Sequence, residues 1–207
     1  KRIVIKIGSS ILIDKKGKPK TIWLKEFAKD VKSLINQKKQ IIIVSSGSIA
    51  LGCEYLGIKK KGLKIEKSQA VASIGQIILM NFYKKIFDIK GIKISQILLT
   101  LDDTELRRRS INAKRTIDNL LSMGVIPIVN ENDTTATTEI KYGDNDRLAS
   151  RVSQIIGADC LILLSDIDGL FTGNPKKSKN TKLIKIVQDI DKNIKKYATN
   201  TESIYGS

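Results

Sequence analysis

The residues with the clearest chemical potential lie in one polar block, NENDTTATTEIKYGDNDRLA, at positions 130–149. The block directly follows the apolar run VIPIV and contains five carboxylates together with amide and hydroxyl side chains. Capping a helix at GDND would use only one of these carboxylates. A site for a zwitterionic substrate needs carboxylates for an ammonium and amide or hydroxyl donors for a carboxylate, and this block supplies both. Asp133, Asp144, Asn145 and Asp146 are therefore candidates for a small-molecule site.

Two glycine turns carry groups that could bind phosphate. KIGSS places Lys6 and Gly8 at the end of one apolar run, and SSGS places Ser46 and Gly47 at the end of another. Glycine lets backbone N–H groups approach a phosphate closely, and a lysine ammonium neutralises its charge. The combination suits phosphoryl transfer, in which catalysis consists mainly of positioning and charge neutralisation. Taken singly, each motif is explained more simply by a tight turn, with Lys6 as a surface lysine.

A third polar stretch, SDIDGLFTGNP at 165–175, follows the apolar run LILL. Ser165 and Asp166 open it, and it is either a loop between strands or a contact with the phosphates or ribose of a nucleotide. The P-loop pattern GxxxxGK[ST] and the dinucleotide pattern GxGxxG do not occur, so the folds that use them are unsupported. The sequence has no histidine, so any chemistry must use Lys, Asp, Asn, Ser and backbone groups.

The elements that must position these residues alternate along the chain. Apolar, β-branched runs predict strands at 2–7, 40–45, 94–100, 125–130 and 161–165, and helical spacing predicts helices at 67–87, 104–122 and 144–156, with another capped by Thr21. Strands that are apolar on both faces belong in a sheet covered on both sides. The alternation predicts an open, mainly parallel α/β sheet with right-handed crossovers. Because ligands bind outside the carboxyl ends of such strands, the polar stretches are expected to line one crevice.

The composition narrows the class of protein. A chain of 207 residues with 41% hydrophobic residues fits one domain with a sizeable core. No apolar stretch approaches the roughly 20 residues of a membrane span, and KRIVIKIG is not a leader pattern, so we expect a cytoplasmic protein without a membrane partner. Cys53 and Cys160 stand in apolar contexts, which predicts two buried thiols.

The net charge of +16 is typical of proteins that bind nucleic acid. The lysines are scattered along the chain, however, and aromatic residues make up only 5%, too few for base-stacking platforms. The sequence favours a lysine-rich solvated surface that concentrates anionic substrates near a cleft. No nucleic-acid partner is therefore expected.

In this order and spacing, KIGSS, IVSSGSIALG, VNENDTTATTEIKYGDNDRLA and LLSDIDGLFTGNP resemble the amino acid kinase family, and the likeness covers essentially the whole chain. The resemblance implies an α/β fold, a three-layer αβα sandwich around an open, mainly parallel sheet. The block around NEND and GDND is similar to that of members that phosphorylate glutamate, and unlike that of the uridylate, aspartate, acetylglutamate and carbamate kinases. It implies ATP-dependent phosphorylation of the γ-carboxylate of L-glutamate to γ-glutamyl phosphate, the first step of proline biosynthesis.

The resemblance also implies residue roles. Lys6 would be the catalytic cation at the transferring phosphoryl group, Asp146 would orient the catalytic lysines, and the Gly8 and Gly47 amides would hold phosphate oxygens. The glutamate site would comprise Ser46, Gly47, Asn130, Asp133, Asp144 and Asn145, and the nucleotide site Lys6, Gly8, Ser165 and Asp166. No protein base is required, because a glutamate carboxylate is already an anionic nucleophile at neutral pH. Mg²⁺ would arrive with ATP, held by phosphates and water and not by a protein metal site.

Further expectations concern the extent of the chain and its partners. Residues 1 to about 150 are expected to form the glutamate-binding half, and 151–207 the start of the nucleotide-binding half. The family's Gly-Gly-Met-x-Thr-Lys segment is absent from the sequence, which ends in TESIYGS, so the domain is expected to be incomplete at the C-terminus. Proline as feedback inhibitor and a homodimer or homotetramer are implied as well. The alternatives are another small-molecule kinase of the same fold, such as one acting on a nucleoside monophosphate, and a basic nucleic-acid-binding protein.

Overall fold

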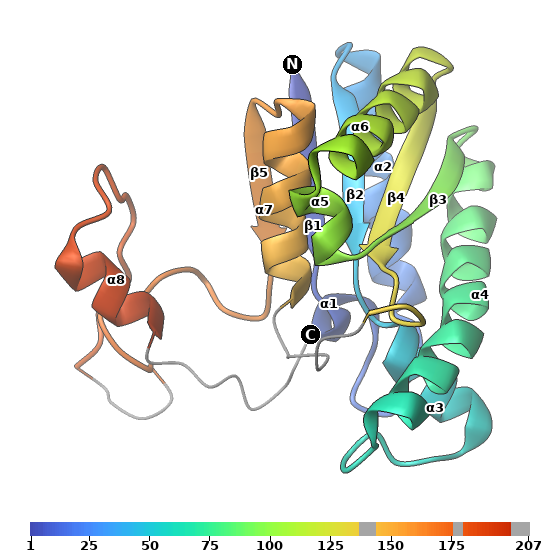
Figure 1. The fold of residues 1–207 in the computed structure, drawn as a ribbon, viewed down its shortest axis with the longest axis horizontal. Helices are drawn as coiled ribbons and strands as arrows, with labels where there is room; N and C mark the ends of the chain where they lie inside the picture. The colour runs from blue at the N-terminus through green and yellow to red at the C-terminus, as the bar shows by residue number, and fades with distance from the viewer. Residues whose placement is uncertain (137–143, 176–179, 200–207) are drawn as a thin grey trace.

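A computed structural model describes residues 1–136, 144–175 and 180–199 (Figure 1). In these residues the strands are β1 (Arg2–Ile7), β2 (Gln40–Ser45), β3 (Lys93–Leu99), β4 (Val125–Glu131) and β5 (Cys160–Leu164). The helices are α1 (Ser9–Leu12), α2 (Thr21–Asn36), α3 (Ser48–Leu56), α4 (Ile65–Ile89), α5 (Leu101–Glu105), α6 (Arg107–Ser122), α7 (Asp144–Ile156) and α8 (Lys192–Thr199). Within the described ranges, no helix is both long and apolar enough to cross a bilayer.

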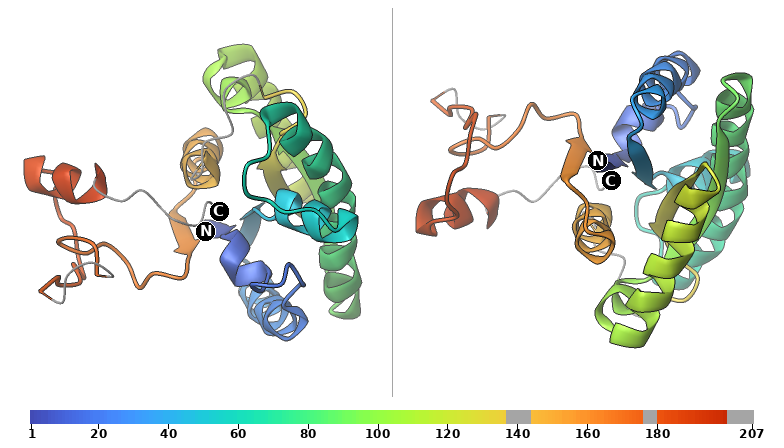
Figure 2. Two further views of the ribbon diagram at one scale, coloured as in Figure 1. Left: turned by 90° about the horizontal axis from the view of Figure 1, so that it is seen from below. Right: turned by 90° about the horizontal axis from the view of Figure 1, so that it is seen from above.

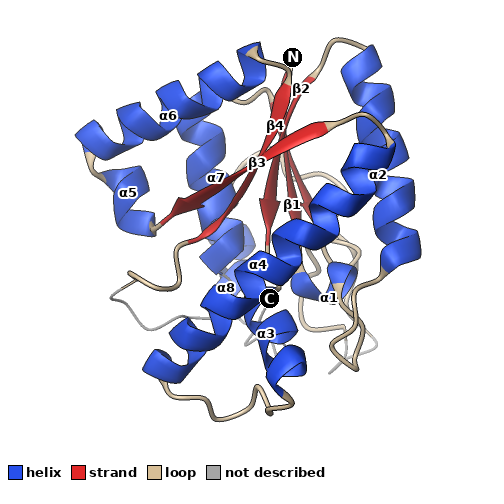
Figure 3. Cartoon of the chain, turned by 90° about the vertical axis from the view of Figure 1, so that its right-hand side faces the viewer, coloured by secondary structure: helices blue, strands red, loops and turns tan. Residues whose placement is uncertain are grey.

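The strands form one sheet in the order β3-β4-β2-β1-β5, and every neighbouring pair is parallel. The five predicted strands are confirmed, with boundaries that differ by at most one residue at either end. Because all strands run the same way, their carboxyl ends meet at one edge of the sheet. Figure 3 shows α3 beyond this edge, close to the N-terminal part of α4.

Helices cover both faces of the sheet, which confirms the three-layer αβα prediction (Figure 2). Successive side chains of a strand point to opposite faces. One core therefore joins the odd positions of β1 to α2 and α4, and a second joins Val4 and the even positions of β2 to α6 and α7. Burying a large apolar side chain of this kind stabilises the fold by roughly 1.5–3 kcal/mol. Lys6 lies two residues after Val4, so the alternation directs it to the α7 face.

The edge strand β5 is less covered than its sequence predicted. Ile162 and Leu163 are 38% and 51% exposed, and the expectation that Cys160 is buried is wrong, whereas Cys53 is buried as predicted. The cause is position in the sheet: β5 has one neighbour, β1, and the segment that follows it leads away from the sheet toward α8 (Figures 1 and 2). An apolar run shows strand propensity, and does not show whether the strand is central or at an edge.

Two helix predictions needed correction. Thr21 is the first residue of α2 and not its cap, because the N-cap position belongs to Lys20 and no side chain caps this end. The helix expected at 104–122 is two helices, α5 and α6, because Leu106 has extended backbone between them. A capping box, in which Thr100 and Asp103 satisfy each other's backbone amides, starts α5 earlier than the apolar spacing indicated. The short helix α3 had not been predicted at all.

Candidate active site

The sheet order brings the predicted polar segments next to one another. The ends of β4, β2, β1 and β5 lie side by side in that order, and they lead into Asn130–Asp133, Ser46–Gly47, Gly8 and Ser165–Asp166 respectively. The expected crevice therefore has its residues at one edge of the sheet, as parallel strands require.

Lys6 and Asp146 form the electrostatic centre of this edge. The Lys6 ammonium lies 2.8 Å from Asp146 Oδ1, and the lysine side chain is 4% exposed whereas the aspartate is 53% exposed. A buried ammonium is costly unless it is paired, so the carboxylate at the start of α7 offsets the loss of hydration at β1. The pair joins the KIGSS and GDND motifs, with its carboxylate facing solvent and its ammonium buried.

Gly8 lies beside the same ammonium, in a different role from the one expected. A Cβ atom at Gly8 would lie 3.4 Å from the Leu164 carbonyl oxygen and 3.6 Å from Lys6 Nζ, so the Gly8 backbone passes close to the cation with no side chain between them. Its amide, however, donates a 3.1 Å hydrogen bond to the Leu164 carbonyl and extends the pairing of β1 with β5. That N–H group is engaged in the sheet in this structure, because the register of β1 and β5 continues one residue beyond the strands.

Gly47 joins β2 to α3 in a conformation that favours glycine. Its φ is +114°, and a Cβ atom there would lie 2.7 Å from Ile13 Cδ1. The preceding Ser46 is 1% exposed, and its Oγ is buried without a hydrogen-bond partner among the described residues. A buried polar atom without a partner is uncommon in proteins and fits a site that a ligand completes.

Asn130 and Asp133 form the wall that follows β4. Asn130 is 3% exposed; its Oδ1 accepts a hydrogen bond from the Glu131 amide, while its Nδ2 has no partner in the described part of the chain. Asp133 is buried and accepts a 3.2 Å hydrogen bond from Ser48 Oγ. Burial raises the pKa of Asp133 to about 6, and the Ser48 hydroxyl acts in the opposite direction. Near neutral pH this site therefore presents a poorly solvated carboxylate, which a substrate ammonium would stabilise.

The first turn of α7 supplies the amide expected there. Asn145 Oδ1 is buried and has no partner among the residues that the structure describes. Asp144 begins the helix, and its side chain lies outside the described parts. Glu139 and Lys141, which contribute to the polar density of the block, also lie outside the described residues.

Ser165 and Asp166 follow β5 and are exposed, and Ser165 Oγ lies 3.4 Å from Asp166 Oδ1. In the described part of the chain, no hydrogen bond or ion pair joins them to Lys6 or to Asp146, so they share the sheet edge and not the ion pair.

Helix α4 contributes polar contacts that the sequence analysis missed. Gln69 Nε2 donates a 3.0 Å hydrogen bond to the Ala136 carbonyl, and Gln76 Oε1 accepts one of 3.1 Å from Gln96. Gln76 is 8% exposed and its amide also approaches the Glu131 carbonyl at 3.5 Å. A glutamine at a core-facing helical position was the available signal, because a buried amide requires partners.

The sequence model of the amino acid kinase family matches residues 1–205. The chain belongs to the amino acid kinase family. This agrees with the parallel sheet and with the polar residues at its carboxyl edge.

Relatives within the amino acid kinase family are similar over most of the chain. A glutamate 5-kinase from Pelagibacter ubique is 67% identical over 207 residues, which is 100% of this chain and 56% of the relative. A glutamate 5-kinase from Brucella ovis is 50% identical over 198 residues, 96% of this chain and 52% of the relative. The chain thus spans about half the length of these curated relatives. The solved structure of a UMP kinase from Bacillus anthracis superposes with a TM-score of 0.57 at 18% identity, covering 88% of this chain and 72% of that one, which shows the shared fold.

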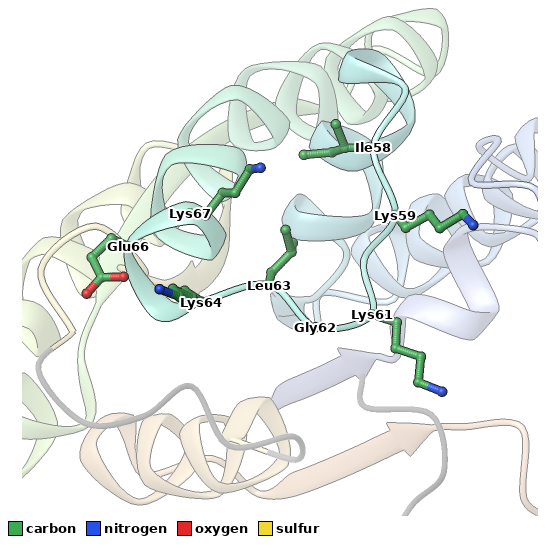
Figure 4. A pocket seen from close by; sticks show the side chains of 8 residues that line it. All are labelled: Ile58, Lys59, Lys61, Gly62, Leu63, Lys64, Glu66 and Lys67. Atoms are coloured by element: carbon green, nitrogen blue, oxygen red, sulfur yellow. The ribbon is translucent and has the colours of Figure 1, made fainter.

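A hollow of about 500 Å³ lies elsewhere, around the loop between α3 and α4. Figure 4 shows Ile58 and Leu63 pointing into it, while the ammonium groups of Lys59 and Lys61 point away. None of the predicted site residues lines it. Lys59 and Lys61 therefore do not face this hollow, and the candidate active site of this amino acid kinase family member remains the sheet edge. Across the described ranges, no three Cys, Asp or Glu side chains gather as a metal site would require.

Proposed function

We propose that the protein uses ATP to phosphorylate the γ-carboxylate of L-glutamate, giving ADP and γ-glutamyl phosphate, the first step of proline biosynthesis. The observation that carries the proposal is the buried Lys6 ammonium, paired with Asp146 and beside the Gly8 backbone, at the carboxyl edge of the sheet. The similarity to glutamate 5-kinases supports the choice of substrate.

In this reaction an oxygen of the γ-carboxylate attacks the γ-phosphorus of ATP. The bond from that phosphorus to the bridging oxygen breaks, and ADP leaves with the electron pair. Lys6 neutralises charge on the transferring phosphoryl group, and Asp146 keeps its ammonium at the sheet edge. No proton has to be removed from the nucleophile, because the carboxylate is already ionised at neutral pH.

The glutamate α-ammonium and α-carboxylate require opposite kinds of partner, and the wall after β4 has both. Asp133 offers a buried carboxylate for the ammonium. Ser46 Oγ and Asn130 Nδ2 are buried donors whose partners among the described residues are missing, and they suit the α-carboxylate. Asn145, Asp144 and the Gly47 turn complete this side of the site.

The nucleotide side begins after about residue 150 and includes Ser165 and Asp166, which are exposed at the end of β5. Mg²⁺ enters with ATP as part of the substrate. Inhibition by proline and assembly into a dimer or tetramer belong to the same proposal.

The first test is ADP release by the intact protein with Mg-ATP, comparing L-glutamate with aspartate, acetylglutamate and UMP. Hydroxylamine is included because it converts an acyl phosphate into a hydroxamate. We expect ADP and hydroxamate that both depend on glutamate. Turnover that depends on UMP or another acceptor would indicate a different kinase of this fold and refute the glutamate assignment. Addition of proline to the same assay tests feedback inhibition.

A further inference from the structure

Helices α3 and α4 approach each other closely enough for their backbones to touch. A Cβ atom at Gly75 would lie 1.7 Å from the Ser48 carbonyl oxygen, and one at Gly52 would lie 2.1 Å from the Val71 carbonyl oxygen. No side chain larger than hydrogen fits at either crossing point. The first residue of α3, Ser48, is therefore fixed against α4 at the end nearest the sheet edge (Figure 3).

The Ser48 side chain reaches across to the wall that follows β4. Its Oγ donates to Asp133 Oδ2 at 3.2 Å, joining residues 85 positions apart, and both residues are buried, at 4% and 7% exposure. The N-terminal end of a helix also favours a nearby negative charge. Among the described residues, no hydrogen bond reaches Asp133 Oδ1, which leaves this oxygen for a ligand.

Helix α4 fixes the other partner too. Gln69 holds the Ala136 carbonyl at 3.0 Å, so the turn that contains Asp133 is tied to the same helix that contacts Ser48. Within that turn, the Thr135 and Ala136 amides both donate to the Asn132 carbonyl. The donor and the acceptor of the Ser48 bond are thus both held by α4.

We propose that Ser48 is a positioning residue for the glutamate site, where its hydroxyl holds the Asp133 carboxylate so that Oδ1 faces the substrate ammonium. This inference rests on the proposed function and adds a residue to it. The hydroxyl also favours the charged form of Asp133, against the burial that raises the pKa of this carboxyl. Both effects strengthen binding of a cationic group, and neither acts on the transferring phosphoryl group.

The test compares steady-state kinetics of the wild-type protein, Ser48→Ala and a matched control, Ser73→Ala. Ser73 is exposed on α4, and within the described residues its hydroxyl bonds only to the Ala70 carbonyl one turn away, so the control removes a hydroxyl without touching the wall. We expect Ser48→Ala to raise the glutamate KM roughly tenfold, the scale of one hydrogen bond to a charged group. Its kcat and its KM for ATP should stay within about twofold of wild type, because the lost contact acts on glutamate binding.

A double-mutant cycle with Asp133→Asn shows whether Ser48 acts through Asp133. In the Asp133→Asn background, Ser48→Ala should change the glutamate KM by less than about twofold, because asparagine, even when Ser48 holds it, carries no charge to bind the substrate ammonium. Equal effects of Ser48→Ala in both backgrounds would overturn the proposal. So would a wild-type glutamate KM in Ser48→Ala, or a loss confined to kcat.

A second measurement does not depend on turnover. The side-chain carboxyl ¹³C signal of Asp133, followed by NMR against pH, should titrate at a higher pH in Ser48→Ala than in wild type, and an unchanged midpoint would overturn the contact. If the wild-type protein shows no glutamate-dependent turnover, the proposed function is refuted. If the wild-type protein turns over glutamate and Ser48→Ala has an unchanged glutamate KM, only the proposed role of Ser48 is refuted.

Discussion

Replacing Asp133 with asparagine should stabilise the folded protein at neutral pH while it weakens glutamate binding. Burial raises the pKa of Asp133 from its ordinary 3.8 to about 6, so the folded protein binds this proton more tightly than the unfolded chain does. Stability from this group is present below about pH 4 and is lost as pH rises through about 6. Above that pH the folded protein carries the full cost of a buried charge.

The size of the effect follows from the shift in pKa. About two pK units correspond to about 3 kcal/mol in the free energy of unfolding. Asparagine has nearly the same shape, cannot ionise, and still offers Ser48 an oxygen to donate to. The gain of Asp133→Asn over wild type should therefore be up to about 3 kcal/mol at pH 8, and about half of that at pH 5.

Urea unfolding of both proteins at several pH values between 5 and 8 measures this gain. Asp30→Asn is the matched control, because Asp30 is exposed on α2 and its replacement also removes one negative charge from a chain of net charge +16. Destabilisation by Asp133→Asn at pH 8, or a gain that is the same at pH 5 and pH 8, would show that burial does not raise the pKa of Asp133. A higher glutamate KM in Asp133→Asn would show that the buried charge, although it destabilises the fold, contributes to glutamate binding.

Three further predictions concern the Lys6 centre and the β2 turn. Lys6→Ala should lower kcat by about 10²- to 10³-fold, the scale of one preorganised charge-stabilising group, and a loss below tenfold in steady-state assays would make Lys6 structural. Asp146→Asn should lower kcat far more than it raises the glutamate KM, because Asp146 contacts the Lys6 ammonium; an unchanged kcat would exclude it from catalysis. Gly47→Ala should lower the free energy of unfolding, measured in urea, by more than Gly57→Ala does. Both glycines have positive φ, but a Cβ atom at Gly47 would lie 2.7 Å from Ile13 Cδ1, whereas one at Gly57 would meet nothing within 4 Å. Equal losses of stability in the two variants would show that Ile13 moves aside without cost.

The strands and the places where polar chemistry follows them could be predicted because both depend on local patterns. A short β-branched apolar run forms a strand wherever it lies in the sheet, and the residues after a parallel strand reach the ligand-binding edge in any order of strands. Lys6, Ser46, Asn130 and Asp133 were identified in this way, and each is buried at that edge.

Errors arose where the outcome depended on neighbours. Cys160 is exposed because β5 is an edge strand, and the Gly8 amide is used by Leu164 because the β1–β5 pairing continues past both strands. The separation of α5 from α6 accompanies ion pairs from Glu105 to Arg147 and Arg151 on α7, which no pattern within residues 101–122 could reveal.

From local patterns alone, the sequence predicted the fold class, the strand boundaries to within one residue and the polar residues that follow the strands. Hydrophobic periodicity and glycine or polar residues at strand ends are properties of neighbouring positions. Three features required the folded structure: the strand order β3-β4-β2-β1-β5, the contact of Lys6 with Asp146, and the bond from Ser48 to Asp133. These are contacts between residues far apart along the chain. Their energies depend on burial and on distances of about 3 Å, which exist only once the helices have packed on the sheet.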